Sequence, residues 1–236
     1  MEQSCHRCGA ALNGSDPFCA HCGAPQLRYE ALEESAPSEN TSEAVNDPAG
    51  EYRECSLTVP HRRNLLDLSL AEVGRLGLAV VEAEGPVHTD EVARRIREAF
   101  GLQKTGNRIL KRVRDALALN ARSNLIRREG DFWTIPGREL TEIRTRRAVA
   151  LPLRRASLIS PAEYQLAIVT IIQEAVAIPH DDLGVETARR FGFDRTGPDL
   201  KHEINRQISA LIKAGRVSID GTSLHMANCQ LTICSV

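Results

Sequence analysis

Four cysteines near the N-terminus have a spacing that suits a metal ion. Cys5 and Cys8 form one Cys-x-x-Cys-Gly motif, and Cys19 and Cys22 form a second one after ten intervening residues. Each motif turns the backbone so that two thiolates face one ion, and the glycine that follows permits the close turn. Two such motifs supply four sulfur ligands, the closed tetrahedral shell of structural zinc. The sequence therefore predicts one structural Zn²⁺ bound by these four cysteines.

The segment that carries the cysteines, residues 1–27, is too short to build a hydrophobic core, so the metal would supply its folding energy. Phe18 before the second motif and Gly23-Ala24-Pro25 after it resemble the short zinc-ribbon domains at the ends of many bacterial proteins. Rubredoxin iron sites use similar motifs but need a much longer separation. His6 and His21 lie inside the motifs, and we interpret them as spectators.

Charge and hydropathy limit the classes of partner. Residues 1–63 carry 5 Lys/Arg and 10 Asp/Glu, whereas residues 64–157 carry 18 and 12. A basic middle favours an anionic partner, although solvated arginine-rich helix faces would give the same count. No apolar run reaches the ~18–20 residues of a membrane span, and the N-terminus does not resemble a secretory signal. We therefore expect a cytoplasmic location, where cysteines more often bind metal or stay reduced than form disulfides.

An acidic stretch separates the cysteines from the rest of the chain. Residues 28–63 are rich in glutamate, serine and proline over most of their length and poor in large apolar side chains. Such a composition cannot offset its ordering entropy by burial, so we predict a flexible acidic linker. Cys55, at the end of this stretch, is expected to be an ordinary thiol.

The remaining chain contains one pattern twice. Residues 79–117 align with residues 170–208 without a gap, at an offset of 91 positions, and their apolar positions coincide although few residues are identical. A Ser-x-x-Glu capping box opens each copy, at Ser69 and at Ser160. The alignment therefore predicts a duplicated fold rather than a duplicated active site.

Each copy is predicted to contain three helices followed by a β-hairpin. Thr105 and Thr196 are expected to cap the third helix, and Thr196-Gly-Pro-Asp199 has the form of a capping box. Asp220-Gly221 between β-prone runs marks the second hairpin. This order is that of a winged helix, so the expected fold class is α+β and mainly helical. The predicted divisions are a zinc ribbon at 1–27, a flexible linker at 28–63, winged-helix-like units at 64–137 and 159–236, a basic connector at 138–158 and a C-terminal strand within the second unit.

The third helix of a helix-turn-helix unit is the one that usually enters the major groove. In the first copy this helix and the following hairpin are rich in cations that could neutralise phosphates. The candidate nucleic-acid contacts are Lys104, Arg108, Lys111, Arg112, Arg114, Arg127 and Arg128. In the second copy the acids Asp199 and Glu203 replace Arg108 and Arg112, so nucleic acid is expected on the first unit. The alternative is a solvated basic helix with local acids such as Asp115 as partners.

No group of residues in the sequence forms a recognisable catalytic site. His180-Asp181-Asp182 lies at a predicted helix start and His202-Glu203 lies on a helix face, with no nucleophile or phosphate-binding glycine loop to join them. The chain is therefore predicted not to be an enzyme and to have no small-molecule substrate.

The first copy contains the motifs Gly85-Pro-Val-His88, Glu91-Val-Ala-Arg-Arg-Ile96, Gly101-Leu-Gln-Lys-Thr-Gly106 and Gly130-Asp-Phe-Trp133. They resemble the domain of unknown function at the C-terminus of certain large bacterial superfamily-1 helicases, and the second copy is similar to the continuation of that region. Those helicases often carry a Vsr-like nuclease domain and are associated with antiphage defence. This chain has a zinc ribbon where they have the helicase and nuclease, so neither activity carries over.

These observations lead us to expect a non-enzymatic bacterial protein that is stabilised by zinc and binds nucleic acid, with DNA as the expected partner. The resemblance implies an accessory subunit of a helicase- or nuclease-type DNA-processing or antiphage defence complex. Two alternatives stay open: a protein–protein adaptor without direct DNA contact, and a transcription regulator.

Overall fold

The computed structural model describes residues 50–59 and 64–227. Within these residues the chain is a mixture of helix and strand with six α-helices, as the predicted fold class requires. None of the described helices is both long and apolar enough to cross a bilayer. The predicted zinc ligands Cys5, Cys8, Cys19 and Cys22 and the predicted C-terminal strand lie outside the described residues.

The first half of the fold, residues 65–134, combines three α-helices with a small sheet. Its elements are η1 (Leu65–Asp67), α1 (Leu70–Glu84), β2 (Val87–His88), α2 (Thr89–Ala99), α3 (Asn107–Arg122), β3 (Arg127–Glu129) and β4 (Phe132–Thr134). β4 is the central strand of an antiparallel sheet in the order β2-β4-β3. The apolar faces of the helices share one hydrophobic core, to which Val80, Ile96 and Leu117 belong.

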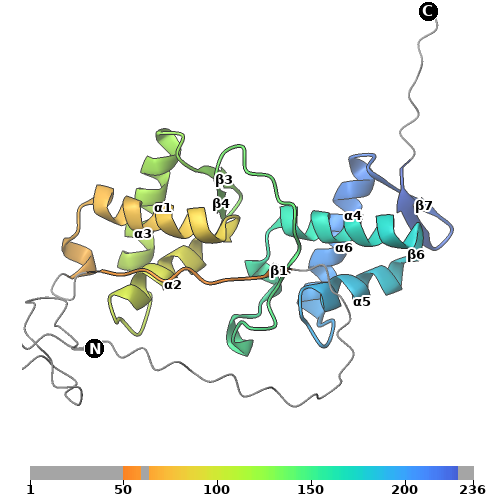
Figure 1. Ribbon diagram of the computed structural model, residues 1–236, viewed down its shortest axis with the longest axis horizontal. Coiled ribbons are helices and arrows are strands. Elements are labelled where there is room, and N and C mark those ends of the chain that lie inside the picture. The colour runs from red at the N-terminus through yellow and green to blue at the C-terminus, as the bar shows by residue number, and fades with distance from the viewer. Residues whose placement is uncertain (1–49, 60–63, 228–236) are drawn as a thin grey trace, which may run out of the picture. The chain divides into compact units, whose positions relative to one another are not determined.

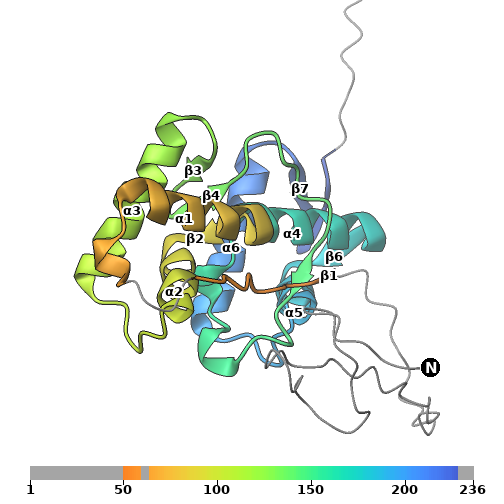
Figure 2. The same ribbon diagram turned by 60° about the vertical axis from the view of Figure 1, so that its left-hand side comes forward.

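The second half, residues 161–226, has the same order of elements. These are α4 (Pro161–Ala175), β6 (Ala177–Pro179), α5 (His180–Arg190), α6 (Pro198–Lys213), β7 (Val217–Asp220) and β8 (Ser223–Met226). Its sheet has the order β6-β8-β7, and it has a core of its own around Tyr164, Phe191 and Ile204. Figures 1 and 2 both show α1–α3 gathered in one group and α4–α6 in another. Both hairpins were predicted, whereas β2 and β6 were not, because two or three residues carry no detectable alternation.

The capping boxes at the starts of α1 and α4 are confirmed. Ser69 Oγ accepts a hydrogen bond from the backbone N–H of Glu72 at 3.2 Å, and Glu72 Oε2 accepts one from the backbone N–H of Ser69 at 2.8 Å. Ser160 and Glu163 make the same reciprocal pair at 3.2 Å in each direction. Two free N–H groups of each helix are thereby satisfied locally.

The predicted caps of the third helices are wrong. Gly106 and Gly197 are the N-cap residues of α3 and α6, and neither helix has a side-chain cap. Each helix begins one residue later than the threonine pattern indicated, so the hydroxyl of Thr105 or Thr196 precedes the capping position. Asp199 is the second residue of α6 and is exposed, so the proposed second capping box does not form.

Residues 50–59, which we call the N-terminal arm, are packed against both halves. β1 (Gly50–Glu51) pairs in parallel with β5 (Arg144–Thr145), and Tyr52 N donates to Thr145 O at 2.9 Å. Glu54 forms an ion pair with Arg94 of α2 at 2.8 Å, and the orange arm in Figures 1 and 2 runs beside that helix. The prediction of a flexible linker is therefore wrong for residues 50–59, because arginines elsewhere in the chain compensate the acidic charge.

The predicted connector, residues 138–158, is packed on the second half. Its elements are β5, η2 (Leu151–Leu153) and η3 (Ala156–Leu158). Ile143 is part of the second core, and Arg146 N donates to Phe191 O at 2.9 Å. Gly192 has a φ of +82°, and a Cβ there would lie 2.6 Å from Arg147 Cγ. Only glycine therefore allows this close approach.

Candidate nucleic-acid interface

The third helix of the first half, α3, has one buried face and one cationic face. Ile109, Val113 and Leu117 point into the core at helical spacing. The exposed cations are Lys104 just before the helix and Arg108, Lys111, Arg114 and Arg122 along it. We call these five residues the basic face. Because the buried stripe fixes the rotation of the helix, these charges are held away from the core and toward solvent.

Most of the basic face lacks carboxylate partners within the described part of the chain. Lys111 Nζ lies 2.8 Å from Asp115 Oδ2, but the Lys111 side chain is 79% exposed. Such an exposed pair is worth little, on the order of 0.2–1 kcal/mol, so it does not prevent Lys111 from meeting another anion. Among the described ion pairs, none involves Lys104, Arg108 or Arg114. These cations could therefore neutralise phosphate without first breaking an ion pair.

Arg112 does not belong to this surface, although the sequence placed it there. Its side chain is half-buried, and its Nη2 donates to the carbonyl oxygen of Leu68, just after η1. Its Nε is buried without a hydrogen-bond partner in the described structure. Arg112 therefore ties α3 to the segment that precedes α1. The helical period alone could not reveal this, because the partner lies 44 residues away in the chain.

Arg122 was missed by the sequence reasoning, and a signal for it existed. It is exposed in the last turn of α3, eleven residues after Lys111, which is about three turns along the same face. A cation in the last turn also suits the negative end of the helix dipole. That structural role is compatible with an additional phosphate contact.

The two arginines of the β3–β4 hairpin are exposed, and each contacts different neighbouring groups. Arg127, 63% exposed, pairs with Glu129 on the same strand. Arg128, 59% exposed, donates from Nε to Gly130 O at 2.7 Å, and its guanidinium lies 5.6 Å from the ring centre of Trp133. Arg128 is thus oriented by cation–π and hydrogen-bond contacts, and it can accept an anion with little loss of rotamer freedom.

The equivalent surface of the second half has a different charge. Asp199, His202 and Asn205 of α6 are at least partly accessible and replace Arg108, Lys111 and Arg114 at the offset of 91. On the hairpin, Ser218 and Ile219 replace Arg127 and Arg128. The backbone therefore presents the same two elements in both halves. The first half has an excess of cations on them, whereas α6 mixes cations such as Lys201 and Arg206 with the acids Asp199 and Glu203.

Many other arginines make contacts inside the structure. One of them, Arg95, forms a buried ion pair with Glu84 in the first half. Glu84 at the end of α1 is fully buried, and its carboxylate receives Arg95 Nε at 2.6 Å and Arg95 Nη2 at 2.9 Å. The same carboxylate accepts the Tyr52 hydroxyl and, at 2.7 Å, the Cys55 backbone N–H. Burial, followed by the charge of Glu84, raises the pKa of Tyr52, so its hydroxyl stays protonated and can donate.

A second buried carboxylate, Glu163, joins the connector to the second half. Arg144 Nη2 lies 2.9 Å and Arg146 Nη2 lies 2.7 Å from Glu163 Oε1. Burial alone would raise the pKa of Glu163, but Arg146 and then Arg144 outweigh that effect and lower it. Arg144 also donates from Nη1 to Glu84 O at 2.6 Å, and both arginines stack on the Tyr52 ring at 5.1 and 4.7 Å. The arm and the two halves are thus joined through one charged network.

The connector consequently does not form a continuous basic track. Arg138 donates to Glu82 O at 2.6 Å and Arg154 donates to Val149 O at 2.7 Å, in addition to the buried pairs of Arg144 and Arg146. The basic composition of the connector is compatible with either an external anion or internal partners. For these four, internal partners take up at least part of each guanidinium.

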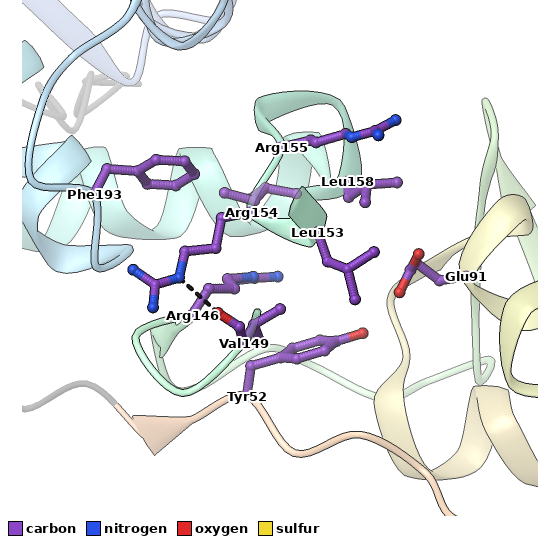
Figure 3. Close-up of a pocket in the computed structure, with 10 residues that line it drawn as sticks. Tyr52, Glu91, Arg146, Val149, Leu153, Arg154, Arg155, Leu158 and Phe193 are labelled. Carbon is purple, nitrogen blue, oxygen red and sulfur yellow. Dashed lines mark hydrogen bonds between the residues drawn. The ribbon is translucent and has the colours of Figure 1, made fainter. Parts of the chain in front are cut away.

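The pocket beside Tyr52 is too small to hold a substrate. Figure 3 shows Glu91 facing it from α2, with Arg146, Val149 and Arg154 around Tyr52 on the other side. Its volume is about 20 Å³, which is room for roughly one water molecule. Among the described residues, no three His, Cys, Asp or Glu side chains gather in a way that could hold a metal ion.

Residues 73–111 match the family described as "Protein of unknown function (DUF3320)". The matched stretch runs from α1 to the first residues of α3, and it fits the resemblance to the helicase-associated domain of unknown function. No curated protein was found to match the chain. The family description assigns no activity, so the function is argued from the side chains.

Proposed function

We propose that this chain binds DNA through the first half, using the basic face of α3 and the hairpin arginines Arg127 and Arg128. The observation that carries the proposal is the contrast between α3 and α6. Both helices occupy the same place in the same arrangement of elements, yet the exposed cations Arg108 and Arg114 are replaced by Asp199 and Asn205. Solubility alone does not require the excess of exposed cations to lie on one half.

The proposed contact is with the phosphate backbone. Arginine and lysine on an exposed helix neutralise phosphates and release condensed counterions, which makes binding weaken steeply with salt. If about four phosphates are contacted, affinity for duplex DNA should fall ~100-fold between 50 and 200 mM salt. If α3 also enters the major groove, as in a winged-helix unit, base contacts would come from its first turns.

We further propose that the protein is a non-enzymatic accessory subunit of a DNA-processing complex. The resemblance to a helicase-associated region supports this, and antiphage defence is the setting that the resemblance suggests. The zinc ribbon proposed for Cys5, Cys8, Cys19 and Cys22 would then be a small structural module of the same chain. Its four thiolates suit one closed, structural Zn²⁺.

Fluorescence anisotropy with labelled duplex and forked DNA over a salt series tests the proposal. The purified chain should bind at 50 mM salt, and Arg108→Glu with Arg114→Glu should weaken binding by at least about tenfold, since two phosphate contacts become repulsive. The matched control is Lys201→Glu with Lys213→Glu, which makes the same change of charge on exposed positions of α6. If both double variants lose affinity equally, the binding reflects net charge and the proposed face is wrong.

One observation favours an adaptor role for the second half. Ile219 and Val185 are 53% and 49% exposed, and they stand where the first half has Arg128 and Arg94. An exposed isoleucine or valine gains free energy by contacting another protein. Of the two equivalent arginines, Arg128 is exposed, whereas Arg94 pairs with carboxylates of the chain itself. The two halves would then have separate partners.

A further inference from the structure

The outer strand of the second sheet, β7, differs from its counterpart β3 in the first half. β7 is an edge strand in the order β6-β8-β7, and among the described residues no strand lies on its other side. Ile219 on β7 is 53% exposed, whereas the equivalent residue of β3 is Arg128. Charged side chains keep a strand edge from pairing with another chain, and an apolar residue leaves the edge open. The free edge of β7 can therefore accept a further strand.

The hydrogen bonds between β7 and β8 show which backbone groups face the free edge. Arg216 O, just before β7, accepts a hydrogen bond at 3.0 Å from the backbone N–H that follows β8. In an antiparallel ladder hydrogen-bonded pairs recur at every second residue, so Ser218 and Asp220 also turn their backbone groups toward β8. The residues between them, Val217 and Ile219, consequently turn their N–H and C=O groups toward the free edge.

A second copy of β7 fits this edge in an antiparallel register with a two-fold axis at Ser218. Val217 then stands opposite Ile219 of the second copy, so the residues with outward backbone groups exchange hydrogen bonds. In the same register Arg216 stands opposite Asp220 of the second copy. Both side chains are exposed, and no described ion pair involves either of them. The two-fold axis makes each of these contacts twice.

The side chains of β7 suit this register, whereas those of β3 do not. Val217 is buried, and Ile219 shares its face of the strand, so each isoleucine would extend the apolar surface beside the other copy's valine. Opposite side chains of antiparallel strands have Cβ atoms about 4.5–5.5 Å apart, which allows an arginine to pair with an aspartate. The same register on β3 would place Arg127 against Arg127 of the second copy, a repulsive contact.

We propose that two copies of this chain associate through β7 and form one continuous antiparallel sheet. The partner that covers the exposed Ile219 is thus a second copy of the chain, held by main-chain hydrogen bonds and by two Arg216–Asp220 pairs. Because few side chains take part, the dimer is weak, with a dissociation constant of roughly micromolar order. The proposal does not rest on DNA binding by the first half, because no residue of the basic face lies on β7.

Sedimentation equilibrium of the full-length chain between about 1 and 300 µM tests the proposal. The average mass should rise from that of one chain toward that of two. Ile219→Arg gives β7 the edge residue of β3 and should keep the protein monomeric over this range. The matched control Val185→Arg also introduces the residue of the first half at an exposed position, but on α5, and should change the dissociation constant less than about twofold. A monomeric wild-type chain, or equal losses in the two variants, would overturn the proposal.

Exchange of the two charges tests the register. Arg216→Asp and Asp220→Arg should each weaken association at least about fivefold, because like charges then meet on both sides of the axis. The double variant restores the pair with the signs exchanged and should return to within about twofold of the wild type. A double variant that stays as weak as the single ones would contradict the register.

A disulfide at the axis locates the contact directly. In a chain with Cys229→Ser and Cys234→Ser, Ser218→Cys places two Cα atoms about 4.5 Å apart across the axis, within disulfide range. Oxidised glutathione should link residue 218 of the two copies, as mass spectrometry of the linked peptides would show. Asp220→Cys should not link to itself, because its two copies lie about 13 Å apart. A dimer in which neither position, or both, became linked would assign the association to another surface.

Discussion

The two halves share a sequence of elements and differ in how they use charge. In the first half, arginine and lysine cover the outside of α3, and one ion pair, Glu84 with Arg95, is buried inside. In the second half Ala175 and Glu186 take the places of that pair, and the outer face of α6 is mixed. Most of the apolar positions that form each core coincide at the offset of 91, with exceptions such as Ile96, which Thr187 replaces. Such a fold is therefore specified by its buried apolar pattern, while charged positions are free to diverge in function.

The largest expected effect concerns the buried pair that only the first half has. Glu84→Ala would leave the Arg95 guanidinium, 2% exposed, without its main partner. Breaking a buried pair in this way costs about 3–5 kcal/mol of unfolding free energy. At the equivalent position of the second half, the exposed Ala175, a change to glutamate should cost less than about 1 kcal/mol.

Urea unfolding followed by tryptophan fluorescence measures this difference. The only tryptophan of the chain, Trp133, is buried in the first half, where its Nε1 donates to Thr89 Oγ1 at 2.8 Å. Its fluorescence therefore reports the first half, and circular dichroism reports both halves together. Similar losses for Glu84→Ala and Ala175→Glu would show that the buried pair has no special role.

The two capping glutamates provide the next comparison. Glu163 is fully buried and receives Arg144 and Arg146, whereas Glu72 at the equivalent position is only partly buried. Glu163→Gln should lower stability by about 2–3 kcal/mol, the range for charge-assisted hydrogen bonds. Glu72→Gln should cost under about 1 kcal/mol, because a glutamine can still complete the capping box. Thermal unfolding followed by circular dichroism distinguishes the two.

The buried carboxylate of Glu163 also predicts how the stability of the protein depends on pH. The pKa of Glu163 is lowered from its ordinary value of 4.5, so the folded state binds its proton less readily than the unfolded state does. The stability that this group contributes is present above that ordinary value and is lost as the pH falls through the folded-state pKa. Wild-type stability should therefore decline below about pH 4.5, and Glu163→Gln should flatten the decline. A decline of the same slope in both proteins would assign the acid sensitivity to other carboxylates.

Local patterns predicted the parts of the fold that are fixed by nearby residues. The capping boxes at Ser69 and Ser160 and the two hairpins each depend on residues a few positions apart and were found where expected, whereas the equally local caps at Thr105 and Thr196 were wrong. The N-terminal arm was missed because its order depends on distant partners. Tyr52 is 32 residues from Glu84 in the chain and further still from Arg146, and no short-range periodicity encodes such contacts.

For the candidate site too, positions set by the helical period were predicted correctly, and a contact with a distant residue was missed. The exposure of Arg108, Lys111 and Arg114 follows from the helical period once the buried stripe is known. Arg112 sits at the border of that stripe, where a rotation of a few degrees decides between solvent and a neighbouring carbonyl. Periodicity does not resolve such border positions, and only the tertiary contact with Leu68 determines the outcome.

Mutation of Arg112 should therefore affect mainly stability, whereas mutation of Arg108 should affect mainly DNA affinity. Arg112→Ala should lower stability by about 1–2 kcal/mol, because the hydrogen bond to the Leu68 carbonyl is lost. Its effect on DNA affinity should stay below about twofold. Arg108→Ala should leave stability within about 0.5 kcal/mol and should weaken DNA binding about threefold through the loss of one phosphate contact. Anisotropy measures the DNA affinity of both variants, and urea unfolding measures their stability. If Arg112→Ala weakened DNA binding as much as Arg108→Ala does, the structural role assigned to Arg112 would be wrong.

The smallest effect on either half is expected from removing the predicted zinc. Cys5→Ser with Cys8→Ser should abolish a metal content of about one zinc per chain, measured by plasma emission spectroscopy. DNA affinity should nevertheless change by less than about twofold, because no charge of the basic face is altered. The Trp133 unfolding midpoint should also be unchanged, since the contacts of the arm come from Tyr52, Glu54 and Cys55, which the substitutions leave in place. Stoichiometric iron in the wild-type protein would refute the zinc assignment, whereas a large loss of DNA affinity would make the cysteine-rich segment a third participant beside the two halves.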